Sequence, residues 1–193
     1  MLERVQDRSW LQTLHTGGIR LHGAQRALAQ WAIVDDYNTI LDLHGQDTRL
    51  LQYFAQKFSL RACGIADHVE QARALRREAP EAEIFCARKE DIPWRSESFD
   101  CVFYQVKAHE AERNPAFLQE AARVLKPGGQ MLIAVQGLPD GLCRLAAAAG
   151  LTETDAQMNT RALLQAMEQA GLADVSYRMV QPLVGVAMGW KRT

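Results

Sequence analysis

The amino-acid sequence predicts an α/β fold with a mostly parallel sheet. Short apolar runs of strand length alternate along the chain with segments that have helical periodicity. This alternation is typical of right-handed strand–helix–strand crossovers, which place consecutive strands in parallel. Two strand-like runs close the sequence, at 173–180 and 184–190. We expect them to form an antiparallel pair at the edge of the sheet.

The remaining elements are expected in a regular order. Apolar runs predict five strands, at 40–43, 60–65, 83–87, 99–105 and 130–136. Helical spacing of apolar residues predicts helices at 21–31, 48–57, 69–78, 114–124, 142–149 and 160–170, and a short amphipathic segment at 1–16. The first strand, bounded by turn residues, fits a central parallel strand that is covered on both faces. Gly171 is placed to end the last helix in the left-handed conformation.

Composition and charge exclude several classes of protein. Hydrophobic residues make up 48% and charged residues 23% of the 193 residues, and the net charge is −1, which is ordinary for a soluble globular protein of one domain. A near-neutral chain gives no electrostatic case for binding nucleic acid or an anionic membrane. No apolar run approaches a transmembrane span and residues 1–10 are too charged for a signal peptide, so we expect a cytoplasmic protein.

The four cysteines are expected to be reduced thiols rather than metal ligands. They include no C-x-x-C pair and no metal-type spacing: Cys63, Cys86, Cys101 and Cys143. The first three fall in or beside apolar, strand-like segments, where a buried thiol acts as a small hydrophobic group.

Residues 39–50, TILDLHGQDTRL, predict a strand, a tight loop and the start of a helix. In an open α/β sheet, such a junction at the carboxyl ends of the strands is where a nucleotide-type ligand binds. The stretch resembles the first motif of class I S-adenosylmethionine-dependent methyltransferases, D-x-G-x-G-x-G, with Asp42 as the acidic residue. Side chains stand at the three glycine positions of that motif: His44, Gln46 and Thr48. Gly45 is out of register with the motif.

Other segments carry the same resemblance, in the correct order and spacing. Residues 90–100, EDIPWRSESFD, resemble the family's E-D-L-P-F-x-x-x-S-F-D, and residues 121–129, AARVLKPGG, resemble its A-R-V-L-K-P-G-G turn. His109 aligns with the first histidine of V-L-H-H after the fourth strand, and residues 163–175 resemble the helix–Gly–strand step before the terminal hairpin. The resemblance implies the Rossmann-like class I methyltransferase fold, a seven-stranded sheet with helices on both faces.

Three positions that bind the cofactor in this family differ here. The family's glycines let the backbone approach the methionine part of S-adenosylmethionine, whereas here three side chains are expected to enter that space. The acidic ribose acceptor of the family corresponds to Ala66, with Asp67 one residue later, and such a slip normally points a strand side chain the other way. The family's aspartate near the adenine corresponds to Arg88. If binding is retained, the resemblance implies these cofactor contacts: Asp42, His44, Gly45, Gln46, Asp67, Glu90 and Asp91.

The resemblance also implies a domain organisation. We expect a single methyltransferase-like domain over 1–193, with an N-terminal helical or lid segment at 1–36. A core of cofactor-binding type follows at 37–136, and C-terminal helices with the terminal strand pair occupy 137–193.

Two main functions follow from these residues. The first is an S-adenosylmethionine-dependent methyltransferase that acts on a small molecule, with His109 as the candidate general base. The alternative is a catalytically inactive protein of the same fold, whose pocket is filled by its own side chains and which binds or regulates a protein partner. A third hypothesis keeps the crevice for another ligand, with Arg88 and His44 recognising its negative charge.

Overall fold

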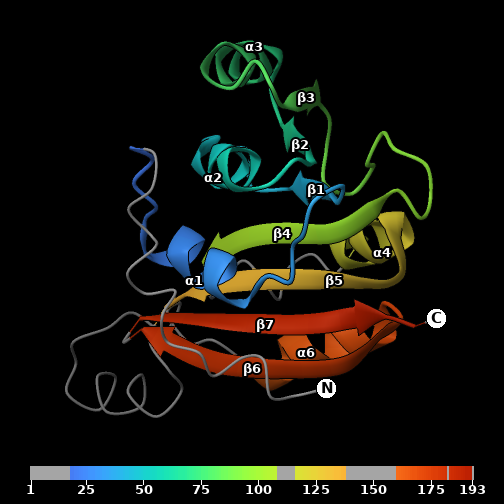
Figure 1. Cartoon of the computed structure of the whole chain (residues 1–193). Coiled ribbons are helices and arrows are strands. Elements are labelled where there is room, and N and C mark those ends of the chain that lie inside the picture. Colours follow the sequence, from blue (N-terminus) through green and yellow to red (C-terminus); the bar gives the residue numbers. More distant parts are fainter. Residues whose placement is uncertain (1–17, 108–115, 138–159, 182, 193) are drawn as a thin grey trace.

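The described part of the chain folds around a seven-stranded sheet. The computed structural model describes residues 18–107, 116–137, 160–181 and 183–192, and the strands lie in the order β3-β2-β1-β4-β5-β7-β6 (Figure 1). Their bounds are β1 Thr39–Asp42, β2 Arg61–Ala66, β3 Glu83–Cys86, β4 Phe99–Lys107, β5 Leu125–Gln136, β6 Leu172–Gln181 and β7 Val184–Lys191.

The directions of the strands confirm the predicted fold class. Neighbouring strands from β3 through β5 pair in parallel, whereas β7 pairs antiparallel with both β5 and β6. β6 is therefore the outer strand, and β7 lies one place further in, between β5 and β6. This inner place explains why residues 184–189 of β7 are all buried while β6 is largely half-buried or exposed.

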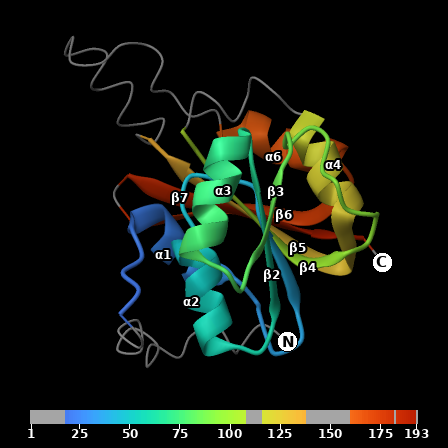
Figure 2. The same cartoon turned by 90° about the horizontal axis from the view of Figure 1, so that it is seen from above.

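Helices cover both faces of the sheet. On one face lie α1 (Gly23–Trp31), α2 (Arg49–Lys57) and α3 (Val69–Glu78), and on the other lie α4 (Ala116–Val124) and α6 (Thr160–Gln169), as Figures 1 and 2 show together. Each helix presents a buried apolar stripe to the strands, as amphipathic spacing predicts.

Alternate residues of the central strands divide between the two faces. Ile40 and Phe103 belong to the core under α1–α3, while Leu41 and Tyr104 belong to the core under α4 and α6. Phe54 of α2 stacks on Phe103, with 5.3 Å between the ring centroids. Both faces of β1 and β4 are therefore covered, as was predicted for the first strand.

Two predictions about local structure need correction. Cys86 is exposed, because it ends β3, an outer strand of the sheet whose only buried residue is Ile84. Cys63 and Cys101 are buried as predicted, and burial raises the pKa of the Cys63 thiol to about 12. β5 begins at Leu125 rather than at 130, because Leu125 pairs with Phe99 before the register shifts around the turn of Gly128, whose φ is +76°.

Several predictions concern residues that the structure does not describe. The expected helix at 142–149, the segment 1–16 and Cys143 lie outside the described residues. The proposed division of residues 1–193 into three parts stays a prediction.

Within the described ranges, every helix is too short or too polar to cross a membrane. The last helix, α6, ends as predicted at a left-handed Gly171, whose φ is +95°.

Candidate functional site

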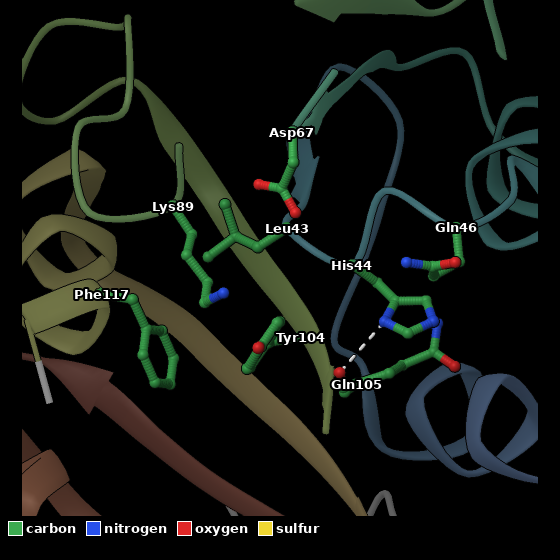
Figure 3. Close-up of a pocket in the computed structure, with 8 residues that line it drawn as sticks. All are labelled: Leu43, His44, Gln46, Asp67, Lys89, Tyr104, Gln105 and Phe117. Carbon is green, nitrogen blue, oxygen red and sulfur yellow. Dashed lines mark hydrogen bonds between the residues drawn. The ribbon is translucent and has the colours of Figure 1, made fainter. Parts of the chain in front are cut away.

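An open cavity lies at the carboxyl ends of the central strands. Its volume is about 300 Å³, and Figure 3 shows the residues that line it. They come from the ends of β1, β2 and β4, from the segment after β3, and from α4: Leu43, His44, Gln46, Asp67, Lys89, Tyr104, Gln105 and Phe117. The cavity is therefore where the sequence predicted a nucleotide-type ligand to bind.

Asp42 anchors the loop that follows β1. Its carboxylate is 2% exposed and accepts a hydrogen bond of 2.9 Å from the backbone N–H of His44. Burial raises the pKa of Asp42 to about 7, against the lowering effect of the His44 N–H and with a further rise from the nearby Asp47 carboxylate. Asp42 is not among the residues that line the cavity, so its side chain holds the loop in place without facing a ligand.

Gly45 is the position where this loop requires glycine. Its φ of +64° lies in the left-handed region, and a Cβ there would stand 2.5 Å from the backbone oxygen of Ile65 in β2. The backbone oxygen of Gly45 accepts a 2.6 Å hydrogen bond from Nε2 of Gln71 in α3. Gly45 therefore lets the loop pack against β2 and α3, which is why a glycine stands here rather than at the motif positions.

The three side chains at the motif's glycine positions lie in different environments. His44 lines the cavity, and its Nδ1 lies 3.1 Å from the backbone carbonyl oxygen of Gln105 in β4. Because a carbonyl oxygen only accepts, His44 donates from Nδ1. Gln46 also lines the cavity, but Thr48 is 2% exposed and precedes the first residue of α2. Two side chains, rather than the expected three, thus border the ligand space.

Asp67 lies in the cavity, contrary to the alternation expected from the sequence. Ala66 is the last residue of β2 and packs in the core under α1–α3. Asp67 follows in a bend, and its carboxylate points into the cavity (Figure 3). The strict alternation of side chains applies only within a strand, so the chain turns Asp67 toward the site after β2 has ended.

Lys89, rather than Arg88, is the cation of the site. The Arg88 side chain is 82% exposed and lies 3.8 Å from Glu90, and it does not line the cavity. The Lys89 side chain points into the cavity (Figure 3), with its Nζ 5.9 Å from the centroid of the Tyr104 ring. Lys89 lies one residue after Arg88, the position that the resemblance aligned with the family's adenine aspartate, so the sequence alone did not single it out.

The remaining predicted site residues do not line the cavity. Oε1 of Glu90 lies 3.9 Å from Nζ of Lys89, and Asp91 is exposed. Neither is a lining residue. His109, the candidate general base, lies outside the described residues.

Tyr104 and Gln105 of β4 and Phe117 of α4 complete the site, and none of them was named individually as a cofactor contact. Tyr104 packs on Phe117 of α4 with 4.7 Å between the ring centroids. Gln105 follows Tyr104 in β4 and is 6% exposed, and its Nε2 has no hydrogen-bond partner among the described residues. A glutamine directly after the apolar run of residues 101–104 was the one signal in the sequence for this position.

Helix α1 is tied to the loop beside the cavity. The Nε2 of Gln25, a residue that is 2% exposed, donates a 2.7 Å hydrogen bond to Oδ1 of Asp47. The same oxygen accepts the backbone N–H of Arg49, the first residue of α2, at 3.0 Å. Asp47 therefore joins α1, the loop and α2.

The donors and acceptors of the cavity fit S-adenosylmethionine, although its loop is altered. The Asp67 carboxylate can accept hydrogen bonds from ribose hydroxyls, and the Lys89 ammonium can donate to a ligand oxygen. The volume of about 300 Å³ is at the lower end of the range for small-molecule sites. In the part of the chain that the structure describes, no group of three or more His, Cys, Asp or Glu side chains is placed to hold a metal ion.

Comparisons with known proteins agree with the motifs and with the fold. Residues 44–133 match the family model described as "Methyltransferase domain". The biotin biosynthesis bifunctional protein BioHC of Cellvibrio japonicus is 32% identical over 100 residues, which are 50% of this chain but only 20% of that protein.

Solved methyltransferase structures share the fold. A chain in the complex of the Haloferax volcanii Trm112 methyltransferase activator with a methyltransferase superposes with a TM-score of 0.70 at 18% identity, over 88% of this chain and 89% of that one. A SAM-dependent methyltransferase from Thermotoga maritima gives 0.66 at 16% identity, over 88% and 87% of the two chains. Geranyl diphosphate C-methyltransferase from Streptomyces coelicolor, in a complex containing S-adenosyl-L-homocysteine, gives 0.64 at 12% identity, over 87% and 74%.

These findings confirm the resemblance that the sequence motifs carried. Residues 44–133 belong to the methyltransferase domain family, and the chain that contains them has the fold of the class I S-adenosylmethionine-dependent methyltransferases.

Proposed function

We propose that this protein binds S-adenosylmethionine and transfers its methyl group to a small molecule. The observation that carries the proposal is the position of Asp67, whose carboxylate points into an open cavity at the carboxyl ends of β1, β2 and β4 (Figure 3). An acceptor at the end of β2 is suited to ribose hydroxyls, and it replaces the acidic residue that is missing at Ala66.

The loop of residues 43–48 supports the same proposal. Asp42 and Gly45 hold it against β2, and Leu43, His44 and Gln46 border the cavity. These side chains leave an open space of about 300 Å³ between them and Lys89. When bound, S-adenosylmethionine supplies a methyl group on a sulfonium, and the chain's part is mainly to bring the acceptor into line with it.

The character of the cavity favours a small acceptor molecule. Tyr104 and Phe117 form an aromatic wall beside Lys89, and clefts lined by aromatic side chains with a few polar groups are typical of small-molecule binding. The chain's net charge of −1 gives no attraction for a nucleic acid. His109 is proposed as the general base from the sequence alone.

One observation favours the alternative, an inactive protein of the same fold. His44 and Gln46 occupy the cavity wall where family members have glycine, and the His44 ring is fixed on the Gln105 carbonyl. If these side chains exclude the cofactor, the protein serves as a binding or regulatory partner of another protein.

Titration calorimetry with S-adenosylmethionine and S-adenosylhomocysteine distinguishes the two functions. We expect binding at micromolar strength, because Asp67 supplies a carboxylate in place of the acidic residue that is missing at Ala66. Circular dichroism on the same sample shows whether the protein is folded. A folded protein that gives no heat at millimolar ligand would exclude the methyltransferase mechanism and leave the alternative.

A further inference from the structure

Lys89 brings a positive charge into the cavity without a close partner. Its side chain is 29% exposed, and its ammonium group points into the cavity (Figure 3). Among the described residues, the one carboxylate within 4 Å of Nζ is that of Glu90, whose Oε1 is 3.9 Å away and therefore beyond hydrogen-bonding distance. Asp67 lines the same cavity but forms no ion pair with Lys89.

Two other half-buried lysines show what a lysine held by the protein itself looks like. Nζ of Lys126 donates to both carboxylate oxygens of Asp100, at 3.0 and 2.8 Å. Nζ of Lys191 donates to the backbone oxygen of Leu125 at 2.8 Å. Taking an ammonium group out of water costs free energy unless close partners compensate for it. Lys89 has no such bond within the described part of the chain, so an anion in the cavity is the partner that its position favours.

The surface beside the Lys89 ammonium is aromatic. Nζ lies 5.9 Å from the centroid of the Tyr104 ring, and that ring packs on Phe117 with 4.7 Å between the centroids. Both rings line the cavity. A cation next to an aromatic wall is suited to an organic anion, whose apolar part packs on the rings while its charged group meets the ammonium.

The charge of the cofactor assigns this part of the cavity to the other reactant. The sulfonium of S-adenosylmethionine is positive, and like charges repel most strongly where water is partly excluded. Lys89 therefore disfavours a sulfonium next to it, and Asp67, the carboxylate among the described lining residues, favours one. An acceptor with a negative charge satisfies Lys89 and is also attracted to the sulfonium.

We propose that Lys89 binds an anionic group of the methyl acceptor, and that the acceptor is an organic acid whose apolar part packs on Tyr104 and Phe117. The inference rests on the proposed function, since it takes the second ligand of the cavity to be a methyl acceptor. It narrows the small molecule to an organic acid, as opposed to an amine or a neutral compound.

The test uses two probes of the same shape and different charge, 2-naphthoate and 2-naphthamide. Calorimetry at neutral pH measures the binding of each probe to the protein saturated with S-adenosylhomocysteine. The wild type should bind the carboxylate about tenfold more tightly than the amide, because a hydrogen bond between two charged groups is stronger than one to a neutral group. Lys89→Met should bind the two probes equally, and Lys89→Arg should keep the preference for the carboxylate.

Two controls separate a binding role from a structural one. Lys89→Met should unfold at the same temperature as the wild type, because the ammonium makes no hydrogen bond within the described part of the fold. Lys57→Met removes a lysine that stands over the Phe58 ring, away from the cavity, and should bind both probes as the wild type does.

The outcomes distinguish this inference from the proposed function. If the wild type binds neither probe or binds both equally, or if Lys89→Met loses affinity for S-adenosylhomocysteine itself, the role of Lys89 toward the acceptor is overturned while the cofactor assignment stands. If the folded wild type does not bind S-adenosylhomocysteine, the proposed function and the acceptor role fall together. A preference for naphthoate that depends on Lys89 in the protein alone would then show an anion site with a different purpose.

Discussion

The loop after β1 and the bend after β2 stand at the same edge of the sheet but are built differently. The loop of residues 43–48 is held by the Asp42 carboxylate, by the close approach of Gly45 to β2 and by the contact of His44 with Gln105. Asp67 in the bend is exposed, and no described residue bonds its carboxylate.

The difference shows that structure and ligand contact are divided between the two connections. Most polar groups of the loop are engaged within the protein, so the loop mainly defines the wall of the cavity. The bend leaves its carboxylate available for a ligand. Changes in the loop should therefore alter stability, and a change at Asp67 should alter binding alone.

Gly45→Ala is expected to have the largest effect. The new Cβ would meet the Ile65 carbonyl oxygen at 2.5 Å in a left-handed backbone, so the free energy of unfolding should fall by about 4 kcal/mol, the sum of strain and overpacking. Denaturation in urea measures the loss. Gly128→Ala is the control, because Gly128 shares the positive φ but nothing lies within 4 Å, and it should lose about 1 kcal/mol. Equal losses in the two variants would contradict the close approach.

Ionisation of Asp42 should make the stability depend on pH. The folded pKa is raised from 3.8 to about 7, so the folded state holds a proton that the unfolded state has released between these values. The free energy of unfolding therefore falls as the pH rises from about 4 to 7, by about 3 kcal/mol for a shift of this size.

Asp42→Asn tests that dependence. The amide oxygen of asparagine can still accept the His44 N–H, but it carries no charge. The variant should match the wild type near pH 4 and be more stable at pH 8, as measured by urea denaturation across the range. If the free energy of unfolding changed with pH between 4 and 7 in the same way for the wild type and the variant, the raised pKa of Asp42 would be refuted.

Asp67→Asn should weaken ligand binding and leave the fold unchanged. Losing a charged acceptor for the ribose hydroxyls should cost about 2 kcal/mol of binding, or roughly thirtyfold in the dissociation constant of S-adenosylhomocysteine. Glu81→Gln changes an exposed carboxylate outside the cavity and should bind normally. Calorimetry and thermal unfolding of both variants make the comparison, and a destabilised Asp67→Asn would show that the bend is structural after all.

Gln25→Leu should have the smallest effect. It removes the buried hydrogen bond to Asp47 that joins α1 to the loop and the bond that the Gln25 Oε1 accepts from the His22 backbone N–H at the start of α1, so the free energy of unfolding should fall by about 1.5 kcal/mol. Gln52→Leu removes an exposed bond and should lose less than about 0.5 kcal/mol. The Arg49 backbone N–H also donates to Asp47. Its hydrogen exchange should become faster in Gln25→Leu and stay unchanged in Gln52→Leu.

Much of the fold followed from sequence patterns because those patterns are local. The bounds of α3 are the predicted ones, 69–78, and α6 begins at the predicted residue, Thr160. The start of β5 was wrong by several residues, because the pairing of Leu125 with Phe99 is a contact between distant parts of the chain. Periodicity along one segment carries no information about such a partner.

The candidate site was only partly predictable from the sequence. His44, Gln46 and Asp67 do line the cavity, whereas Asp42 and Gly45 support it and Glu90 and Asp91 do not line it. Lys89 and Gln105 were not named as individual contacts. Gln105 lies within β4, where its neighbours decide which way it points, and the place of Lys89 depends on how the chain leaves the end of β3. An error of one residue at such an end assigns Arg88, which does not line the cavity, to the site in place of Lys89, which does.

The sequence by itself determined the order of the elements, the parallel sheet and the family, because hydrophobic periodicity and short motifs are properties of neighbouring residues. Only the tertiary structure decided that Gly45 serves the packing of the loop on β2 rather than the ligand. It alone also decided that Asp67 turns into the cavity. The physical reason is the same in both cases: the course of the chain past the end of a strand depends on the neighbouring strands that the backbone meets.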